Sequence, residues 1–129
     1  MMPPNNAGTV APGNEVSLPD EGPSSGITNI GPGTFLLPNV GTYDVAFSVS
    51  VDEPGQLVLV LTGLELPYTV YGKATATSEI TGDALIQTTT PGSLLSLNNP
   101  TGDTVALTIT PFAGGAQPVA ASITITELN

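Results

Sequence analysis

The side chains that could do chemistry in this 129-residue chain are almost all carboxylates. It has 11 Asp and Glu residues, one lysine (Lys73) and no arginine, histidine or cysteine, which gives a formal net charge of −10. This composition excludes a cysteine nucleophile, a Ser-His-Asp triad and a closed structural zinc site. Phosphate and nucleic-acid binding require a basic surface, so we expect neither nucleic acid nor an anionic membrane as a partner.

Two kinds of catalysis remain compatible with this composition. Two carboxylates about 5–10 Å apart can hydrolyse a glycoside, and a desolvated lysine can act as a nucleophile. However, nearly all the carboxylates stand beside turn residues, where they solubilise the chain and form Asx turns. Lys73 follows Gly72 in a polar stretch, where an exposed lysine is expected. We therefore expect no enzyme activity and no catalytic residue.

Two further groups of residues could bind a ligand. Asn98, Asn99 and Asp103 crowd one turn with oxygen atoms that suit calcium, but no EF-hand-type spacing is present and a plain Asn-Pro-Thr-Gly turn explains them better. We expect no metal and no cofactor there. Tyr68 and Tyr71 could stack on a sugar, but their odd spacing places them on opposite faces of a regular strand. Packing in the core or at a sheet edge is expected for one of them.

Hydrophobic periodicity predicts strands along the chain from Gly31 onward. Apolar residues occupy every odd position from 43 to 51, and the even positions are small or polar. Residues 103–110 and 119–126 alternate in the same way. Residues 57–61 are apolar on both faces, which predicts a strand covered on both sides.

Glycines recur at intervals of 8 to 10 residues at positions 55, 63, 72, 82, 92 and 102, and several stand in turn sequences. Short strands at this spacing are typical of an antiparallel sandwich or barrel. A β-solenoid would have a similar interval, but no motif repeats within the units. Gly or Pro interrupts nearly every long stretch of the chain, and the uninterrupted stretches are rich in β-branched residues, so no helix is expected.

The chain divides into two parts by composition. Residues 1–26 are rich in Pro, Gly, Ser and Asn without periodicity, which predicts a flexible arm before a head domain at residues 27–129. No apolar run approaches the ~18 residues of a membrane span, so no membrane insertion is expected. Residues 1–6 lack the basic and apolar regions of a secretory signal.

Three fragments resemble jelly rolls of the tumour-necrosis-factor and complement-globular-head type. They are Phe35-x-Leu37-Pro-x-x-Gly41-x-Tyr43-x-Val45-x-Phe47, Gly102-Asp103-x-Val105-x-Leu107, and the closing apolar strand 121–128. The sequence of residues 27–129 as a whole most resembles the C-terminal domains of bacterial collagen-like surface glycoproteins, the family of the exosporium protein BclA. The resemblance implies an all-β, antiparallel two-sheet jelly-roll sandwich.

The resemblance also implies a compact homotrimer around a three-fold axis. If the strand after Gly41 and the closing strand share the inner sheet, their odd-numbered residues face the core and their even-numbered residues face the neighbouring chain. The expected interface consists of small side chains on these two strands, together with Leu94 and Ser96 from the segment just before Asn98. The full set is Ala46, Ser48, Leu94, Ser96, Ser122 and Thr124. Without the resemblance, the same face is simply a solvated β surface.

These expectations lead to three competing functions. The first is a structural trimerisation head at the tip of a bacterial cell-surface or spore-surface fibre (exosporium or appendage), with the arm as the tether to a stalk or fibre. The second is an adhesin or lectin-like tip that contacts host glycans or proteins. The third is a bacteriophage fibre or capsid decoration, because viruses use the same jelly roll.

Overall fold

The computed structural model describes residues 9–16, 26–31, 33–51, 53–73, 78–102, 106–108 and 121–128. These residues contain eleven strands and one short 3-10 helix, and no α-helix. In chain order they are β1 (Thr9–Val10), β2 (Thr28–Asn29), β3 (Thr34–Leu37), β4 (Thr42–Val51), β5 (Gly55–Leu61), β6 (Leu64–Glu65), η2 (Pro67–Thr69), β7 (Tyr71–Lys73), β8 (Ser78–Gln87), β9 (Ser93–Asn98), β10 (Leu107–Thr108) and β11 (Ala121–Glu127).

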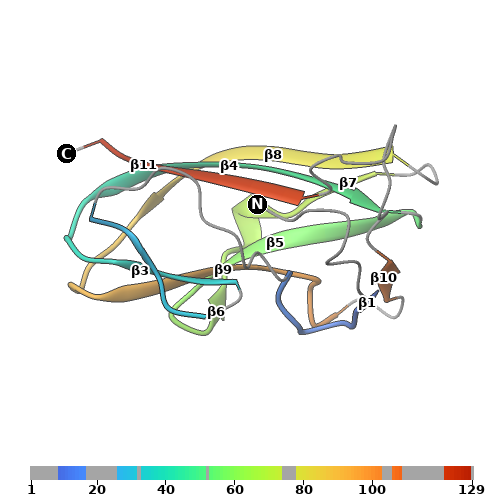
Figure 1. The fold of residues 1–129 in the computed structure, drawn as a ribbon, viewed down its shortest axis with the longest axis horizontal. Coiled ribbons are helices and arrows are strands. Elements are labelled where there is room, and N and C mark those ends of the chain that lie inside the picture. Colours follow the sequence, from blue (N-terminus) through green and yellow to red (C-terminus); the bar gives the residue numbers. More distant parts are fainter. Residues whose placement is uncertain are drawn as a thin grey trace.

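Most strands form two antiparallel sheets that face each other, as Figure 1 shows, and β1 pairs with β10 in a separate two-stranded sheet. One sheet has the order β11-β4-β8 and the other has the order β2-β3-β9-β5-β6, with β7 paired to β5. The longer strands β3, β4, β5, β8, β9 and β11 alternate between the two sheets along the chain. The chain is therefore an all-β antiparallel sandwich of the jelly-roll kind, which confirms the predicted fold class.

Hydrophobic alternation places the core between the sheets. In β4 every odd-numbered residue is buried and every even-numbered residue is half-buried, as predicted. β11 pairs directly with β4, so the strand after Gly41 and the closing strand do share one sheet. The core is built from the inward-facing apolar residues of both sheets, including Leu37, Tyr43, Val45, Phe47, Val49, Val51, Leu57, Leu59, Ile80, Ile86, Leu95 and Leu97.

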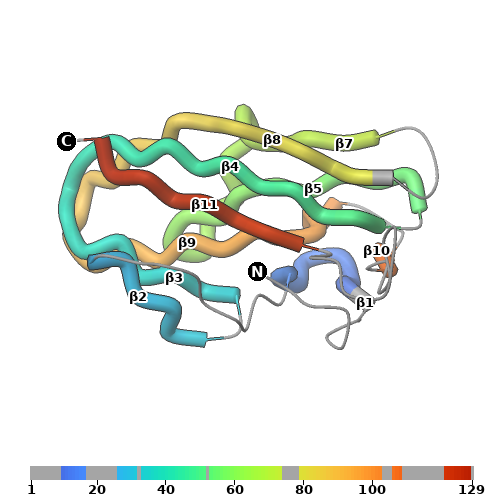
Figure 2. Tube along the Cα trace, turned by 45° about the horizontal axis from the view of Figure 1, so that its top comes forward, coloured from blue at the N-terminus to red at the C-terminus, as the bar shows by residue number. Residues whose placement is uncertain are grey.

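The strand predicted to be covered on both faces is β5. Leu57 and Leu59 face the core, while Val58 and Val60 point to the other face and are nevertheless 0% and 8% exposed. β5 lies inside its sheet, between β9 and the short strands β6 and β7. Figure 2 shows β9 and β7 on either side of it. A strand whose side chains are buried on both faces is apolar at consecutive positions, as β5 is.

Part of the predicted arm belongs to the sandwich. Residues 9–16, called the N-terminal segment below, pair with β10 through β1 and continue along the end of β9, where Val16 N donates to Leu97 O. Val10 and Val16 are buried in the core cluster. The prediction of an unpacked arm through residue 26 is therefore wrong for these residues. Two isolated valines among Pro, Gly and Asn produce no periodicity, so the pattern did not reveal them.

One of the predicted turn glycines lies inside a strand. Gly82 stands near the middle of β8, opposite Phe47. A Cβ atom at this position would come within 2.6 Å of the Phe47 ring and 2.6 Å of the Tyr71 ring. The spacing of the glycines thus reflects close packing at this position, whereas Gly63 and Gly92 do have the positive φ of turn glycines.

Some predicted strand residues lie outside the described ranges: 103–105, 109–110 and 119–120. Residues 1–8 and 17–25 of the predicted arm lie outside them as well. Within the described part of the chain, no helix has the length and apolar character needed to cross a membrane.

Candidate interaction surfaces

The outer face of the β11-β4-β8 sheet carries four of the six residues predicted at a trimer interface. In the register of β11 and β4, Ser122 stands opposite Ser48 and Thr124 stands opposite Ala46. All four side chains point away from the core, because their odd-numbered neighbours fill it. The structure therefore brings them into one patch, which we call the small-residue face: Ala46, Ser48, Ser122 and Thr124.

Carboxylates border the small-residue face on the β8 side. Asp83 stands opposite Ala46, and Glu79 stands opposite Ser50. Ser48 Oγ donates a hydrogen bond of 2.6 Å to Glu79 Oε2. The outer face is thus acidic along β8, while the outward residues of β11 are uncharged.

A second aspartate, Asp44, lies on the same face beside Asp83. The register pairs Asp44 with Leu85 and Ala46 with Asp83, so the two aspartates are diagonal neighbours. A hydrogen bond between the two carboxyl groups, burial and the repulsion between their charges all raise the pKa of Asp44 above its ordinary value. Loss of the Asp44 proton is therefore less favourable than in an isolated aspartate.

The structure does not bring Leu94 and Ser96 to the small-residue face. Both lie on β9, in the opposite sheet, and point outward from it because Leu95 and Leu97 fill the core. Their prediction as part of the same surface is therefore wrong. Alternation identifies the residues that share one face of a strand, but it does not say which sheet contains that strand.

Leu94 and Ser96 instead line an open groove of about 610 Å³ on the outer face of their own sheet. We call it the β5–β9 groove. Its lining comes from five parts of the chain: Gly13, Thr34, Val60, Gly63, Leu64, Glu65, Leu94, Ser96, Asn98 and Thr101.

Hydrogen bonds hold the polar groups of the β5–β9 groove in place. Glu65 Oε2 accepts a bond of 2.8 Å from Thr101 N, and Ser96 Oγ donates a bond of 2.7 Å to Asn98 Oδ1. At one side Thr34 Oγ1 donates a bond of 2.8 Å to Glu15 Oε2. The sequence offered no signal for this groove, because its residues are spread over most of the chain.

The two tyrosines predicted on opposite faces do have different environments. Tyr71 packs edge-to-face on Phe47, with 5.7 Å between the ring centroids, and its hydroxyl donates to Asp83 O. Tyr68 is 62% exposed, and its hydroxyl donates to Leu85 O. Both hydroxyls therefore donate hydrogen bonds to backbone carbonyl groups of β8. Because β8 lies at the edge of its sheet, these contacts agree with the expected packing at a sheet edge.

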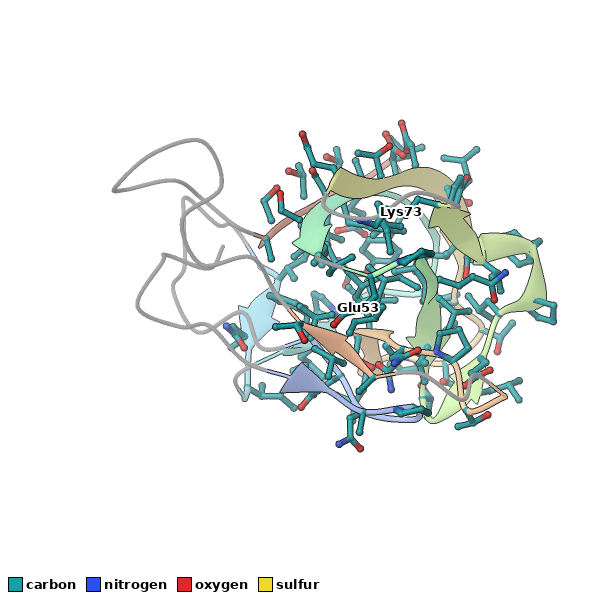
Figure 3. The ribbon with its side chains drawn as sticks, turned by 90° about the vertical axis from the view of Figure 1, so that its right-hand side faces the viewer. Glu53 and Lys73 are labelled. Carbon is teal, nitrogen blue, oxygen red and sulfur yellow. The ribbon has the colours of Figure 1, made fainter. Side chains whose placement is uncertain are left out.

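Lys73 is half-buried at one end of the sandwich (Figure 3), which corrects the expectation of an exposed lysine. Its Nζ donates a bond of 2.7 Å to the backbone oxygen of Val51, the last residue of β4. Glu53, also labelled in Figure 3, accepts two bonds of 2.7 Å from Thr108 N and Oγ1. Burial would raise the pKa of Glu53, but these bonds and the charge of Lys73 outweigh it and lower that pKa. Nothing in the sequence indicated that Glu53 would meet Thr108, 55 positions away.

Two of the three candidate calcium ligands have structural contacts instead. Asn98 Nδ2 donates to Gly13 O, and Asn99 Nδ2 donates to Val10 O, so both amides hold the N-terminal segment. Asp103 lies outside the described residues. Among the residues that the structure describes, no three Asp or Glu side chains gather as a metal site.

The fold and these surfaces define an all-β sandwich with two distinct outer faces. Comparison with models of known protein families finds no match, and no curated protein matches the sequence.

Proposed function

We propose that this protein is a homotrimeric structural head at the tip of a bacterial cell-surface or spore-surface fibre. Its role is to hold three chains together and to present an acidic, resistant surface, with the chain before the N-terminal segment as the tether to a stalk or fibre. The observation that supports this proposal best is the small-residue face. Short side chains at Ala46, Ser48, Ser122 and Thr124 allow a neighbouring chain to approach the sheet closely.

The charge of the chain limits how such a trimer could be held together. Each chain contributes a formal charge of −10 and only one lysine, whose ammonium group bonds to a backbone carbonyl. Ion pairs between chains are therefore scarce, and apolar burial and hydrogen bonds must supply the association free energy. The small-residue face fits this requirement, because it contains no charged side chain itself.

The resemblance to collagen-like surface glycoproteins supports the location on a fibre, and the composition supports a role without catalysis. The single Lys73 bonds to the backbone, and the aspartate pair stands on the outer surface of the β11-β4-β8 sheet, beside the small-residue face. Neither feature supplies a nucleophile in a cleft. The proposal therefore includes no enzyme activity and no cofactor.

A matched pair of substitutions tests the small-residue face as the contact. Thr124→Glu adds a carboxylate to the middle of the face, where its strand partner is the uncharged Ala46. Thr89→Glu makes the same change at an exposed position in the turn before β9. Native mass spectrometry should show a trimer for the unchanged protein and for Thr89→Glu, and mainly single chains for Thr124→Glu.

The chemical reason is that each trimer would bury three additional charges without partners. Circular dichroism provides the control, because Thr124 is exposed in the single chain and its substitution should leave the fold intact. If Thr124→Glu assembles as well as Thr89→Glu does, the small-residue face is not the contact.

A further inference from the structure

The β5–β9 groove lies on the side of the molecule away from the small-residue face. Its residues belong to the outer face of the six-stranded sheet and to its flanking turns, whereas the small-residue face belongs to the other sheet. A contact through the small-residue face therefore does not involve this groove. The proposed trimer leaves the groove exposed and gives it no role.

The groove combines an aliphatic floor with a polar border. Val60, which points to this outer face, and Leu94 contribute apolar surface, and Leu64 at the β5–β6 turn is 68% exposed. Hydroxyl, amide and carboxylate groups surround them, from Thr34, Ser96, Asn98, Glu65 and Thr101. A sugar ring has the same two kinds of surface: apolar C–H groups on its faces and hydroxyl groups around its edge.

The polar groups are also preorganised for such a ligand. Glu65 is held in place because its carboxylate accepts a hydrogen bond from Thr101 N. Asn98 is held in place because its Oδ1 accepts a hydrogen bond from Ser96 Oγ. The remaining lone pairs of the Glu65 carboxylate can accept hydrogen bonds from the hydroxyl groups of a ligand. The second N–H of the Asn98 amide can donate a hydrogen bond to such a hydroxyl group. Groups that are already held in position lose little conformational entropy when a ligand binds.

Charge selects among ligands of this kind. The lining contains the carboxylate of Glu65 and no basic side chain. A second carboxylate, that of Glu15, accepts a hydrogen bond from Thr34 at the side of the groove. A sulfated, phosphorylated or acidic sugar would meet these carboxylates without a counter-charge, in a chain whose net charge is −10. An uncharged sugar meets no such penalty, and its hydroxyl groups donate well to carboxylate oxygens.

We propose that the β5–β9 groove binds an uncharged oligosaccharide. The groove is open along the sheet surface, so it accommodates a few sugar units of a longer chain. The proposal concerns a different face from the trimer contact and does not depend on that contact. It assigns recognition of neutral glycans to the side of the head that stays exposed.

Titration of the full chain with neutral trisaccharides, followed by ¹H–¹⁵N NMR, tests this proposal. The panel contains gluco-, galacto-, manno- and N-acetylglucosamine-configured trisaccharides, with sialylated and sulfated trisaccharides as the anionic arm. We expect at least one neutral sugar to shift the amide signals of Gly63, Leu64, Ser96 and Thr101, with a dissociation constant on the order of 1 mM.

Three variants locate the binding. Ser96→Gln fills the groove, and Glu65→Gln keeps the shape of the side chain while it removes the charge and one strong acceptor. We expect the first to weaken binding roughly tenfold or more and the second roughly threefold or more. Thr89→Gln, on an exposed turn outside the groove, should bind within about twofold of the unchanged protein.

Four results would overturn the proposal. They are an absence of shifts with every neutral sugar, shifts confined to residues outside the groove, full binding by both groove variants, and binding of anionic sugars at least as tight as that of neutral sugars. None of these results bears on the trimer, and a monomeric protein that binds neutral sugars in the groove would refute only the trimer.

Discussion

At the scale of single residues, the aspartate pair on the outer face of the β11-β4-β8 sheet has the clearest energetic consequence. Asp44 and Asp83 are diagonal neighbours, and the pKa of Asp44 is raised by the hydrogen bond between the two carboxyl groups, by burial and by their repulsion. A carboxyl group with a raised pKa in the folded chain destabilises the fold above that pKa. This cost disappears as the pH falls and the proton is taken up.

Asp44→Asn should therefore stabilise the folded protein at neutral pH. The amide can still donate a hydrogen bond to Asp83, and the repulsion between two charges is removed. Urea unfolding at pH 7 should show a higher midpoint for the variant than for the unchanged protein. The difference should shrink as the pH falls through the raised pKa of Asp44, because the unchanged protein gains its proton there. A difference that stays constant with pH, or a less stable variant at pH 7, would contradict the assignment.

Gly82→Ala should destabilise the fold, because the added Cβ atom has no space between Phe47 and Tyr71. Overpacking of this kind costs about 1–3 kcal/mol. Gly102→Ala is the matched control, since a Cβ atom there meets nothing within 4 Å. Urea denaturation should separate the two variants clearly, and equal stability would mean that the two rings move aside freely.

At the scale of elements, the N-terminal segment completes the edge of β9. β3 pairs with β9 from Ser93 to Ser96, and the N-terminal segment continues this pairing beside the start of β3, with a bond of 2.7 Å from Val16 N to Leu97 O. Gly33, just before β3, makes this close approach possible, because a Cβ atom there would collide with Val16 O. The chain that leads to the proposed stalk is thus anchored in the core of the head.

Val16→Ala tests whether this anchor contributes to stability. Val16 is 0% exposed, so its truncation removes buried methyl groups from the core and should cost about 1–3 kcal/mol. Val40→Ala is the same change at a residue that is 53% exposed, and it should have little effect. Thermal or urea unfolding measures both. If the two variants lose equal stability, the N-terminal segment does not belong to the cooperative unit.

The sequence predicted the strands better than their partners. Alternation in β4 and β11 identified which side chains face the core, and the apolar run of β5 indicated a strand covered on both faces. The pattern placed Leu94 and Ser96 on the wrong surface because strand pairing is decided by contacts between distant segments. The same limit applies to Gly82 and to the bonds between Glu53 and Thr108, where the partner residues come from other elements.

At the scale of the whole molecule, charge dominates the behaviour that we expect. Three chains would together carry a formal charge of −30, three times the −10 of one chain, with three lysines to offset it. Exposed charges of one sign repel each other, and salt screens them. An assembly with these properties resists salt, in contrast to one held by ion pairs.

Added NaCl should therefore leave the trimer unchanged or stabilise it. Sedimentation velocity in low salt and at about 1 M NaCl, where the Debye length is about 3 Å, measures this directly. A parallel series in potassium acetate separates screening from an effect of chloride. Dissociation of the trimer by moderate NaCl would show that ion pairs between chains hold it together.

The native mass of the unchanged protein shows whether three chains assemble. One chain has a mass of 13.0 kDa, so the proposed trimer has three times this mass, about 39 kDa. Light scattering at micromolar protein concentration should give the trimer mass and no significant population of single chains. A mass of 13.0 kDa under these conditions would contradict the proposal that this protein is a trimeric head.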